Sequence, residues 1–151
     1  MVHTHQTAPT QFVEANGIRF AYRRFGKVVG IPLVFNQHFT GTMDHWDPPV
    51  TDGFANDREV ILFNNAGVSS SSGEIPTTFE KNGGQRGGLH QGAETEESRC
   101  ARFFNWRFIA EEIALQAPDL VRRLVLVGTG PRGGEDMATL TPEAQEIFGT
   151  T

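Results

Sequence analysis

Cysteine is almost absent from this 151-residue sequence, in which Cys100 is the single instance. One thiol forms no disulfide within the chain and no all-cysteine metal site, so burial of apolar side chains has to stabilise the fold. Positive charge is also in the minority, with 13 Lys and Arg against 18 Asp and Glu and a formal net charge of -5. This balance excludes the basic surface of a typical nucleic-acid-binding domain.

Long apolar runs are missing as well. No stretch approaches the roughly 18 to 20 consecutive apolar residues that a membrane helix needs. Residues 1–6 have neither the basic start nor the apolar stretch of a secretory signal. The hydrophobic fraction of 38% fits one globular domain over residues 1–151. We therefore expect a single cytoplasmic domain with no membrane association.

Glycine and polar residues are concentrated in one part of the chain. Residues 81–92 contain one apolar residue in twelve, and a charged run follows at residues 94–99. A hydrophobic core cannot be built from such a composition. We therefore predict an aberrant, disordered insert at residues 81–107. Residues 1–10 are also polar and lack any period, so we expect a loose leader there.

The first half of the chain predicts strands. Asn16 and Gly17 separate two short segments between residues 12 and 23, and apolar residues alternate with others in the second, a pattern typical of a hairpin. Residues 31–35 and 59–63 are continuous apolar runs, as expected of strands covered on both faces. The segment between them predicts a short helix within residues 43–56, which two prolines at positions 48 and 49 should limit.

The second half predicts a helix and one more strand. Apolar residues recur from position 108 to position 121 with Pro118 near the end, and residues 123–128 form another buried run. The order of elements indicates an α/β sheet with helices on its faces. No strand can be placed between residues 69 and 106, so a central strand is missing. The strands at 60–63 and 124–127 should then have unpaired edges.

Several segments resemble, in the same order, the N-terminal half of the α/β-hydrolase family. The resemblance is to small cofactor-free members of the esterase-like and haloperoxidase-like kind. It covers residues 12–22, 32–41, 60–68, 113–118 and 124–131. It implies a partial α/β-hydrolase sheet, made of an N-terminal hairpin and parallel strands with flanking helices. It also implies hydrolysis of an ester-like or related small substrate by Ser-His-Asp chemistry, without a cofactor or a metal.

In two loops the resemblance extends to individual residues. The loop after the strand at 31–35 would supply one oxyanion-hole amide, from Phe39 or Thr40. The alternative is that this loop only caps the strand and turns at Gly41. The segment from Asn64 onward matches the family pattern D-x-x-G-x-G-x-S, with asparagine in place of the aspartate. Ser69 replaces the second glycine, which favours a different turn.

The motif that carries the chemistry in this family is the nucleophile elbow, G-x-S-x-G, and it is absent. It should lie just before residue 108, where the chain reads Arg102-Phe-Phe-Asn-Trp-Arg107, without serine or glycine. The family places the triad acid and histidine after later strands, which would lie beyond Thr151. We therefore assign no catalytic residue and expect this chain to be inactive.

The genetic code suggests why the elbow is missing. Reading the codons of residues 98–107 one base downstream permits V-D-V-L-G-F-S-I-G-G, provided that Ser98 uses AGY. This string is a buried strand followed by an elbow serine. In the same frame, residues 87–94 permit an amphipathic helix. We therefore interpret residues 81–107 as the family sequence translated in the wrong frame, in a truncated copy.

The sequence also contains other candidate sites. A divergent glycine-rich loop at 81–107 could instead make the chain a non-catalytic binding or interaction module. Histidines and aspartates at positions 38, 44, 45 and 47 lack the converging geometry of a metal site. Cys100 has no arranged base, and the serines at 69–72 are expected in a solvated loop.

Overall fold

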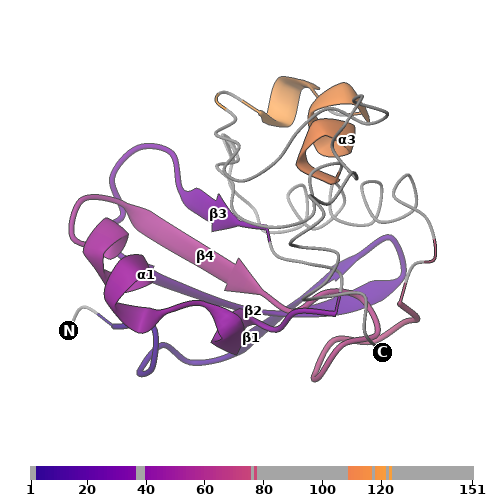
Figure 1. Cartoon of the computed structure of the whole chain (residues 1–151), viewed down its shortest axis with the longest axis horizontal. Helices are drawn as coiled ribbons and strands as arrows, with labels where there is room; N and C mark the ends of the chain where they lie inside the picture. Colours follow the sequence, from indigo (N-terminus) through magenta and orange to yellow (C-terminus); the bar gives the residue numbers. More distant parts are fainter. Residues whose placement is uncertain are drawn as a thin grey trace, which may run out of the picture.

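The computed structural model describes residues 3–36, 40–75, 77, 109–116, 118–121 and 123. The predicted insert at 81–107 and the strand predicted at 124–127 lie outside these residues. Four strands form one sheet in the order β1-β2-β4-β3 (Figure 1). Their bounds are β1 Gln11–Ala15, β2 Ile18–Gly26, β3 Leu33–Phe35 and β4 Glu59–Phe63. The predicted α/β-hydrolase-like partial sheet is confirmed, and its mixed pairing has both parallel and antiparallel strands.

The predicted hairpin is confirmed. Strands β1 and β2 pair antiparallel, and Ala15 lies opposite Ile18 across the turn. Asn16 and Gly17 have φ angles of 51° and 74°. Two consecutive left-handed residues match the twist of the flanking strands, which is why an Asn-Gly pair is favoured at this turn.

Strand β4 lies in the middle of the sheet. It pairs antiparallel with β2, where Tyr22 lies opposite Phe63, and parallel with β3, where Phe35 lies opposite Leu62. All five of its residues are buried, which confirms a strand covered on both faces. The expectation that this strand would have an unpaired edge is wrong, because β2 pairs with one of its edges and β3 with the other. Within the described part of the chain, the sheet ends at β3 instead.

Two apolar clusters cover the two faces of the sheet. The first contains Phe25, Leu33, Phe35, Val60 and Leu62, together with Met43 and Ala55 from the helical segment. The second contains Ile18, Phe20, Val34, Ile61 and Phe63. Successive strand residues point to opposite faces, so neighbours such as Ile61 and Leu62 contribute to different clusters.

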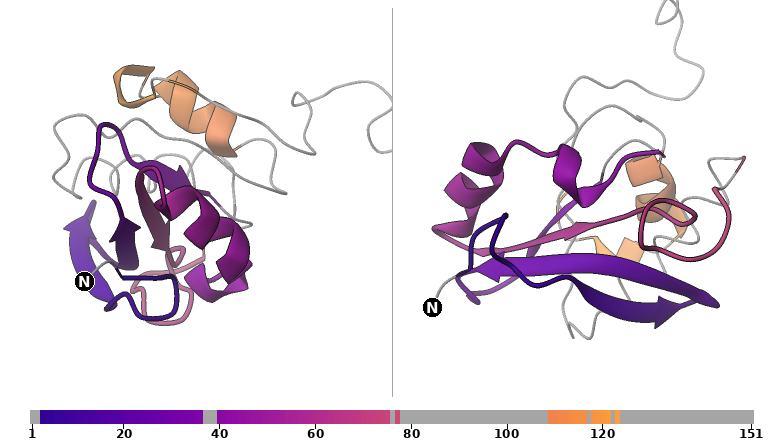
Figure 2. Two further views of the ribbon diagram at one scale, coloured as in Figure 1. Left: turned by 90° about the vertical axis from the view of Figure 1, so that its left-hand side faces the viewer. Right: turned by 90° about the horizontal axis from the view of Figure 1, so that it is seen from below.

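The segment between β3 and β4 forms a 3-10 turn and a helix on the first face (Figure 2). The turn η1 spans Met43–His45, and the helix α1 spans Pro48–Ala55. The short helix predicted within residues 43–56 is confirmed, and the two prolines limit it by marking its beginning. They occupy its first two positions, where a backbone N–H has no acceptor within the helix and a fixed φ angle is already helical.

The later helix is confirmed as α3, Ile109–Gln116, followed by the 3-10 turn η2, Pro118–Leu120. Ile113 is buried, whereas Leu115 is 76% exposed. Val121 packs against the second face of the sheet. The chain after α3 therefore returns to the sheet on the face opposite α1. Within the described helices, no segment is long and apolar enough to cross a bilayer.

The N-terminal segment, residues 3–10, is not a loose leader. His5 and Ala8 are both buried, and the Ala8 N–H donates to the Thr4 carbonyl at 2.9 Å. Ala8 belongs to the first apolar cluster. With only two buried residues among eight, the segment shows no periodic pattern of apolar residues, which is why the sequence predicts a loose segment here.

Candidate functional site

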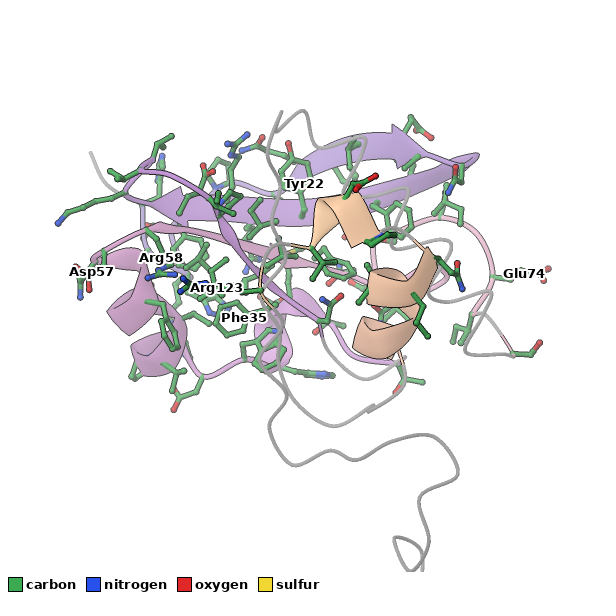
Figure 3. The ribbon with its side chains drawn as sticks, turned by 90° about the horizontal axis from the view of Figure 1, so that it is seen from above. Tyr22, Phe35, Asp57, Arg58, Glu74 and Arg123 are labelled. Atoms are coloured by element: carbon green, nitrogen blue, oxygen red, sulfur yellow. The ribbon has the colours of Figure 1, made fainter. Side chains whose placement is uncertain are left out.

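The candidate site lies at one edge of the sheet, where the parallel strands β3 and β4 both end. In open α/β sheets, ligands bind outside the carboxyl ends of the strands. Arg58 precedes β4 and Glu74 lies in the loop after it, and Figure 3 shows these residues at opposite ends of the molecule. Phe35 is the last residue of β3 and lies between these ends. Because β3 and β4 run parallel, the loops that follow them lie at the same edge of the sheet, on the Glu74 side.

Buried asparagines follow both strands at this edge. Asn36 comes directly after β3, and Asn64 and Asn65 come directly after β4. The Asn64 side chain accepts the backbone N–H of Met43 at 2.8 Å and donates from Nδ2 to the Ser70 hydroxyl at 3.2 Å. One side chain thus holds the start of η1 and the loop after β4 together.

The predicted oxyanion residues belong to the loop between β3 and η1. Phe39 lies outside the described residues. Thr40 is exposed, and Gly41, next to it, is buried. The loop then enters η1, where the His45 N–H donates to the Thr42 carbonyl at 3.1 Å and the Thr42 N–H donates to His45 Nδ1 at 3.2 Å. The position of Thr40 after β3 agrees with the expected loop, while its catalytic use stays a prediction.

The serine-rich loop after β4 is bonded to the sheet and is not simply solvated. Ser71 is buried; its hydroxyl accepts the Ala21 N–H at 2.9 Å and donates to the Asn64 carbonyl at 3.0 Å. The Ser72 hydroxyl accepts the Arg19 N–H at 2.8 Å, and the Ser72 N–H donates to the Arg19 carbonyl at 2.9 Å. Serine suits this loop because its short hydroxyl side chain completes backbone hydrogen bonds, a use that composition alone does not reveal.

Ser69 occupies the position where the resemblance expects glycine. Its φ angle is 52°, in the left-handed region that glycine adopts without cost. Gly67, which matches the first glycine of the pattern, has a φ angle of 71°. A Cβ atom added to Gly67 would lie 2.5 Å from the Ile75 nitrogen, so only glycine fits there. The loop geometry therefore demands the glycine at position 67 and tolerates serine at position 69.

The residues weighed as metal ligands have other partners. Asp44 forms an ion pair with Arg23, and His45 Nδ1 accepts the Thr42 N–H. His38 lies outside the described residues. Among the residues that the structure describes, no group of three or more His, Cys, Asp or Glu side chains converges.

The elbow region and the predicted insert lie outside the described residues. The first element after them is α3, which begins at Ile109, two residues after Arg107. In an elbow the nucleophile sits between a strand and the helix that follows it. The beginning of α3 therefore agrees with an elbow position at residues 102–107, where the sequence has no serine.

Comparisons with known proteins identify the fold. No family model matches the chain, and no curated protein matches it. An α/β-hydrolase-fold protein from Chitinophaga pinensis superposes with a TM-score of 0.80 and 38% sequence identity, over 88% of this chain and 48% of that one.

More distant solved structures share the fold. A haloalkane dehalogenase from Agrobacterium tumefaciens matches at 18% identity and a TM-score of 0.65, over 79% of this chain and 40% of its own. The Cif epoxide hydrolase from Acinetobacter nosocomialis matches at 19% identity and a TM-score of 0.63, over 78% and 37% respectively. This chain spans less than half the length of each of these three neighbours. Their shared fold shows that the chain is an α/β-hydrolase-fold protein.

Proposed function

We propose that this chain derives from a hydrolase that cleaves an ester-like or related small substrate by Ser-His-Asp chemistry. The support is the α/β-hydrolase fold, with 38% identity to one solved member. Solved neighbours are named as a haloalkane dehalogenase, an epoxide hydrolase and a phospholipase, so this fold serves several substrate classes. Among them we propose the ester-like class, because the resemblance is to small cofactor-free esterase-like members.

In the intact hydrolase, the loop after β3 supplies one half of the oxyanion hole. The backbone N–H of Phe39 or Thr40 and the N–H of the residue after the serine donate to the developing oxyanion. Both donors are backbone groups, so their position depends on how firmly the loop is held. The Asn64–Met43 hydrogen bond holds the end of this loop, where it enters η1.

We propose that the chain with the present sequence is catalytically inactive. The observation that carries this proposal is the sequence Arg102–Arg107 directly before α3, where the nucleophile would stand. Loss of a nucleophilic serine alone lowers kcat by roughly six orders of magnitude in a serine hydrolase. The oxyanion hole does not restore this loss: without the triad, it and substrate binding retain only about 10³–10⁴-fold catalysis over water, and the amide of the residue after the serine is missing together with the elbow.

A chromogenic short-chain ester assay on the purified chain tests this proposal. We expect release of the chromophore at the rate of buffer alone. Turnover well above buffer that a serine-reactive phosphonate abolishes would contradict it. The variant Cys100→Ser is the matched control, since it separates thiol reactivity with the ester from catalysis by a serine.

We further propose that residues 81–107 are family sequence translated out of frame. The support is the permitted reading V-D-V-L-G-F-S-I-G-G under residues 98–107, which restores a strand and an elbow at the position before α3. Restoring the frame with one base near Glu80 and one near Arg107 should improve folding. It should not confer ester turnover on these 151 residues, because the repaired stretch supplies the serine alone.

If residues 81–107 instead bind a partner, the chain is an interaction module. Limited proteolysis separates the two accounts. The frame-shift account expects rapid cutting within 81–107, with the same rate when cell extract is added. A protected segment whose cutting slows in extract would favour the interaction module.

The proposed partner of the intact hydrolase is therefore a small-molecule substrate. We propose no cofactor, no nucleic acid and no membrane, and a cytoplasmic location. The net charge of -5 supports the exclusion of nucleic acid, since it disfavours binding to phosphate backbones. Cell fractionation tests the location, with the cytoplasmic fraction as the expected result.

A further inference from the structure

A buried histidine attaches the N-terminal segment to the rest of the fold. His5 is 2% exposed, and its Nδ1 atom lies 2.8 Å from the Thr51 hydroxyl of α1. The His5 backbone N–H donates to the Asp52 carboxylate at 2.7 Å. Its ring lies against Phe25 of β2, with ring centroids 6.0 Å apart. One side chain therefore contacts α1 and β2 from a segment that otherwise buries only Ala8.

The surroundings of the imidazole favour its neutral form. Burial removes water from the ring, and the guanidinium of Arg23 on β2 opposes a second positive charge nearby. The carboxylates of Asp44 and Asp52 and a hydrogen bond with the Met43 backbone act in the other direction. Asp44 is paired with Arg23, and Asp52 accepts the His5 backbone N–H.

We propose that His5 is a pH-sensitive latch, which holds residues 3–10 on α1 when neutral and releases them when protonated. The released segment would expose Phe25 and the buried face of α1 around Thr51. The His5 ring has a hydrogen bond with the backbone of Met43, the first residue of η1, so the segment lies next to the element that follows the candidate oxyanion loop. The proposal concerns the attachment of the segment alone and does not depend on catalysis.

The sign of the pH effect follows from proton binding. Burial and Arg23 lower the pKa of His5 below its ordinary value of 6.5 when the segment is attached. In the released segment the histidine is solvated and its pKa returns to about 6.5. The released state therefore binds more protons, and attachment is strongest above pH 6.5 and weakens as the pH falls below it. The population of the released state should therefore rise as the pH falls from 7.5 to 5.5, by at most about tenfold, the limit reached when the attached histidine binds no proton at pH 5.5.

Amide hydrogen exchange measures this release in the whole chain. The reporters are the His5 and Ala8 amides, whose acceptors are Asp52 and Thr4. Protection factors, taken relative to unstructured rates at each pH, should fall from pH 7.5 to pH 5.5, by at most about tenfold. In His5→Gln, which keeps a hydrogen-bonding side chain but does not titrate, they should be independent of pH. His3→Gln is the matched control, because His3 is exposed in the same segment and its loss should leave the dependence unchanged.

Two results would overturn the latch. One is a pH dependence at the His5 and Ala8 amides that survives in His5→Gln. The other is a pKa of His5 at or above 6.5, measured by NMR titration of its ring in the unsubstituted chain, which needs no variant to fold. A pKa below 6.5 together with a flat His5→Gln profile is the supporting result.

Discussion

The side-chain oxygen of Asn64 accepts the backbone N–H of Met43 at 2.8 Å, in a position where both residues are buried. Through this bond, the residue that follows the central strand holds the element that follows the candidate oxyanion loop. The same side chain donates to Ser70 in the loop after β4. The side-chain amide of Asn64 therefore joins two loops, although the bonded residues lie 21 positions apart in the sequence.

Replacing Asn64 should be costly for stability. Asn64→Ala leaves the buried Met43 N–H without its acceptor, and an unsatisfied buried group costs about 1–3 kcal/mol. Ser70→Ala is the matched control, because it removes only the 3.2 Å bond from Asn64 to an exposed residue. We expect a clearly larger loss of unfolding free energy for Asn64→Ala in urea denaturation. Equal losses in the two variants would show that the Met43 bond contributes little.

Ser69→Gly should stabilise the chain. A serine at a φ angle of 52° carries the steric cost of a left-handed residue, roughly 1–2 kcal/mol, which glycine avoids. This gain exceeds the roughly 0.4–1 kcal/mol that the greater freedom of glycine in the unfolded chain costs. Ser70 does not share this conformation, so Ser70→Gly should lower stability through the greater freedom of glycine in the unfolded chain. Thermal unfolding of both variants checks the opposite signs. A decrease of Tm in Ser69→Gly would refute the strain at this position.

Gly26 and Gly30 should respond very differently to alanine. Both have positive φ angles, 94° and 63°, and so both variants incur the left-handed cost of roughly 1–2 kcal/mol. A Cβ atom at Gly26 would also lie 2.8 Å from the Ala55 carbonyl oxygen, whereas nothing lies within 4 Å of one at Gly30. Overpacking adds about 1–3 kcal/mol in Gly26→Ala. Unfolding free energies that differ by less than the error between the two variants would contradict this account.

Two neighbouring arginines on β2 also make a matched pair. Arg24 donates to both carboxylate oxygens of the buried Glu59, at 2.8 and 2.9 Å, whereas Arg23 pairs with the exposed Asp44. Arg24→Met leaves a buried carboxylate unpaired and should cost about 2–3 kcal/mol, less than a fully buried pair because Arg24 is one-third exposed. Arg23→Met should cost under about 1 kcal/mol.

Urea denaturation at neutral pH compares the two arginine variants. The same titration in 1 M salt adds a second criterion, because salt screens exposed pairs more than buried ones. The effect of Arg23→Met should shrink in salt while that of Arg24→Met persists. The reverse order of costs would mean that the carboxylate of Glu59 is solvated in the folded chain.

The sequence predicts the strands of this sheet well because each carries a strong local signal. The Asn16–Gly17 pair demands a tight turn, and the continuous apolar run at 59–63 marks a strand covered on both faces. Its place in the sheet is not a local property. The position of β4 between β2 and β3 depends on pairing with two strands that are distant in the sequence, which no local pattern marks.

Polar contacts were the part that the sequence did not predict. The burial of His5 depends on Thr51 and Asp52, more than 45 positions away, and no periodic pattern marks such a contact. Likewise, the hydroxyls of Ser71 and Ser72 complete backbone hydrogen bonds of β2, although four consecutive serines read as a solvated loop. In the candidate site, the oxyanion role of the loop after β3 stays a prediction, and the hydrogen bond between Asn64 and Met43 is visible only in three dimensions.

The nucleotide sequence under residues 98–107 tests the central claim most directly, because the frame-shift account fixes what it must contain. The account predicts an AGY codon for Ser98 and third bases that let the frame one base downstream encode V-D-V-L-G-F-S-I-G-G. A TCN codon at Ser98, or a third base that places a stop codon or a charged residue within the elbow, would contradict it.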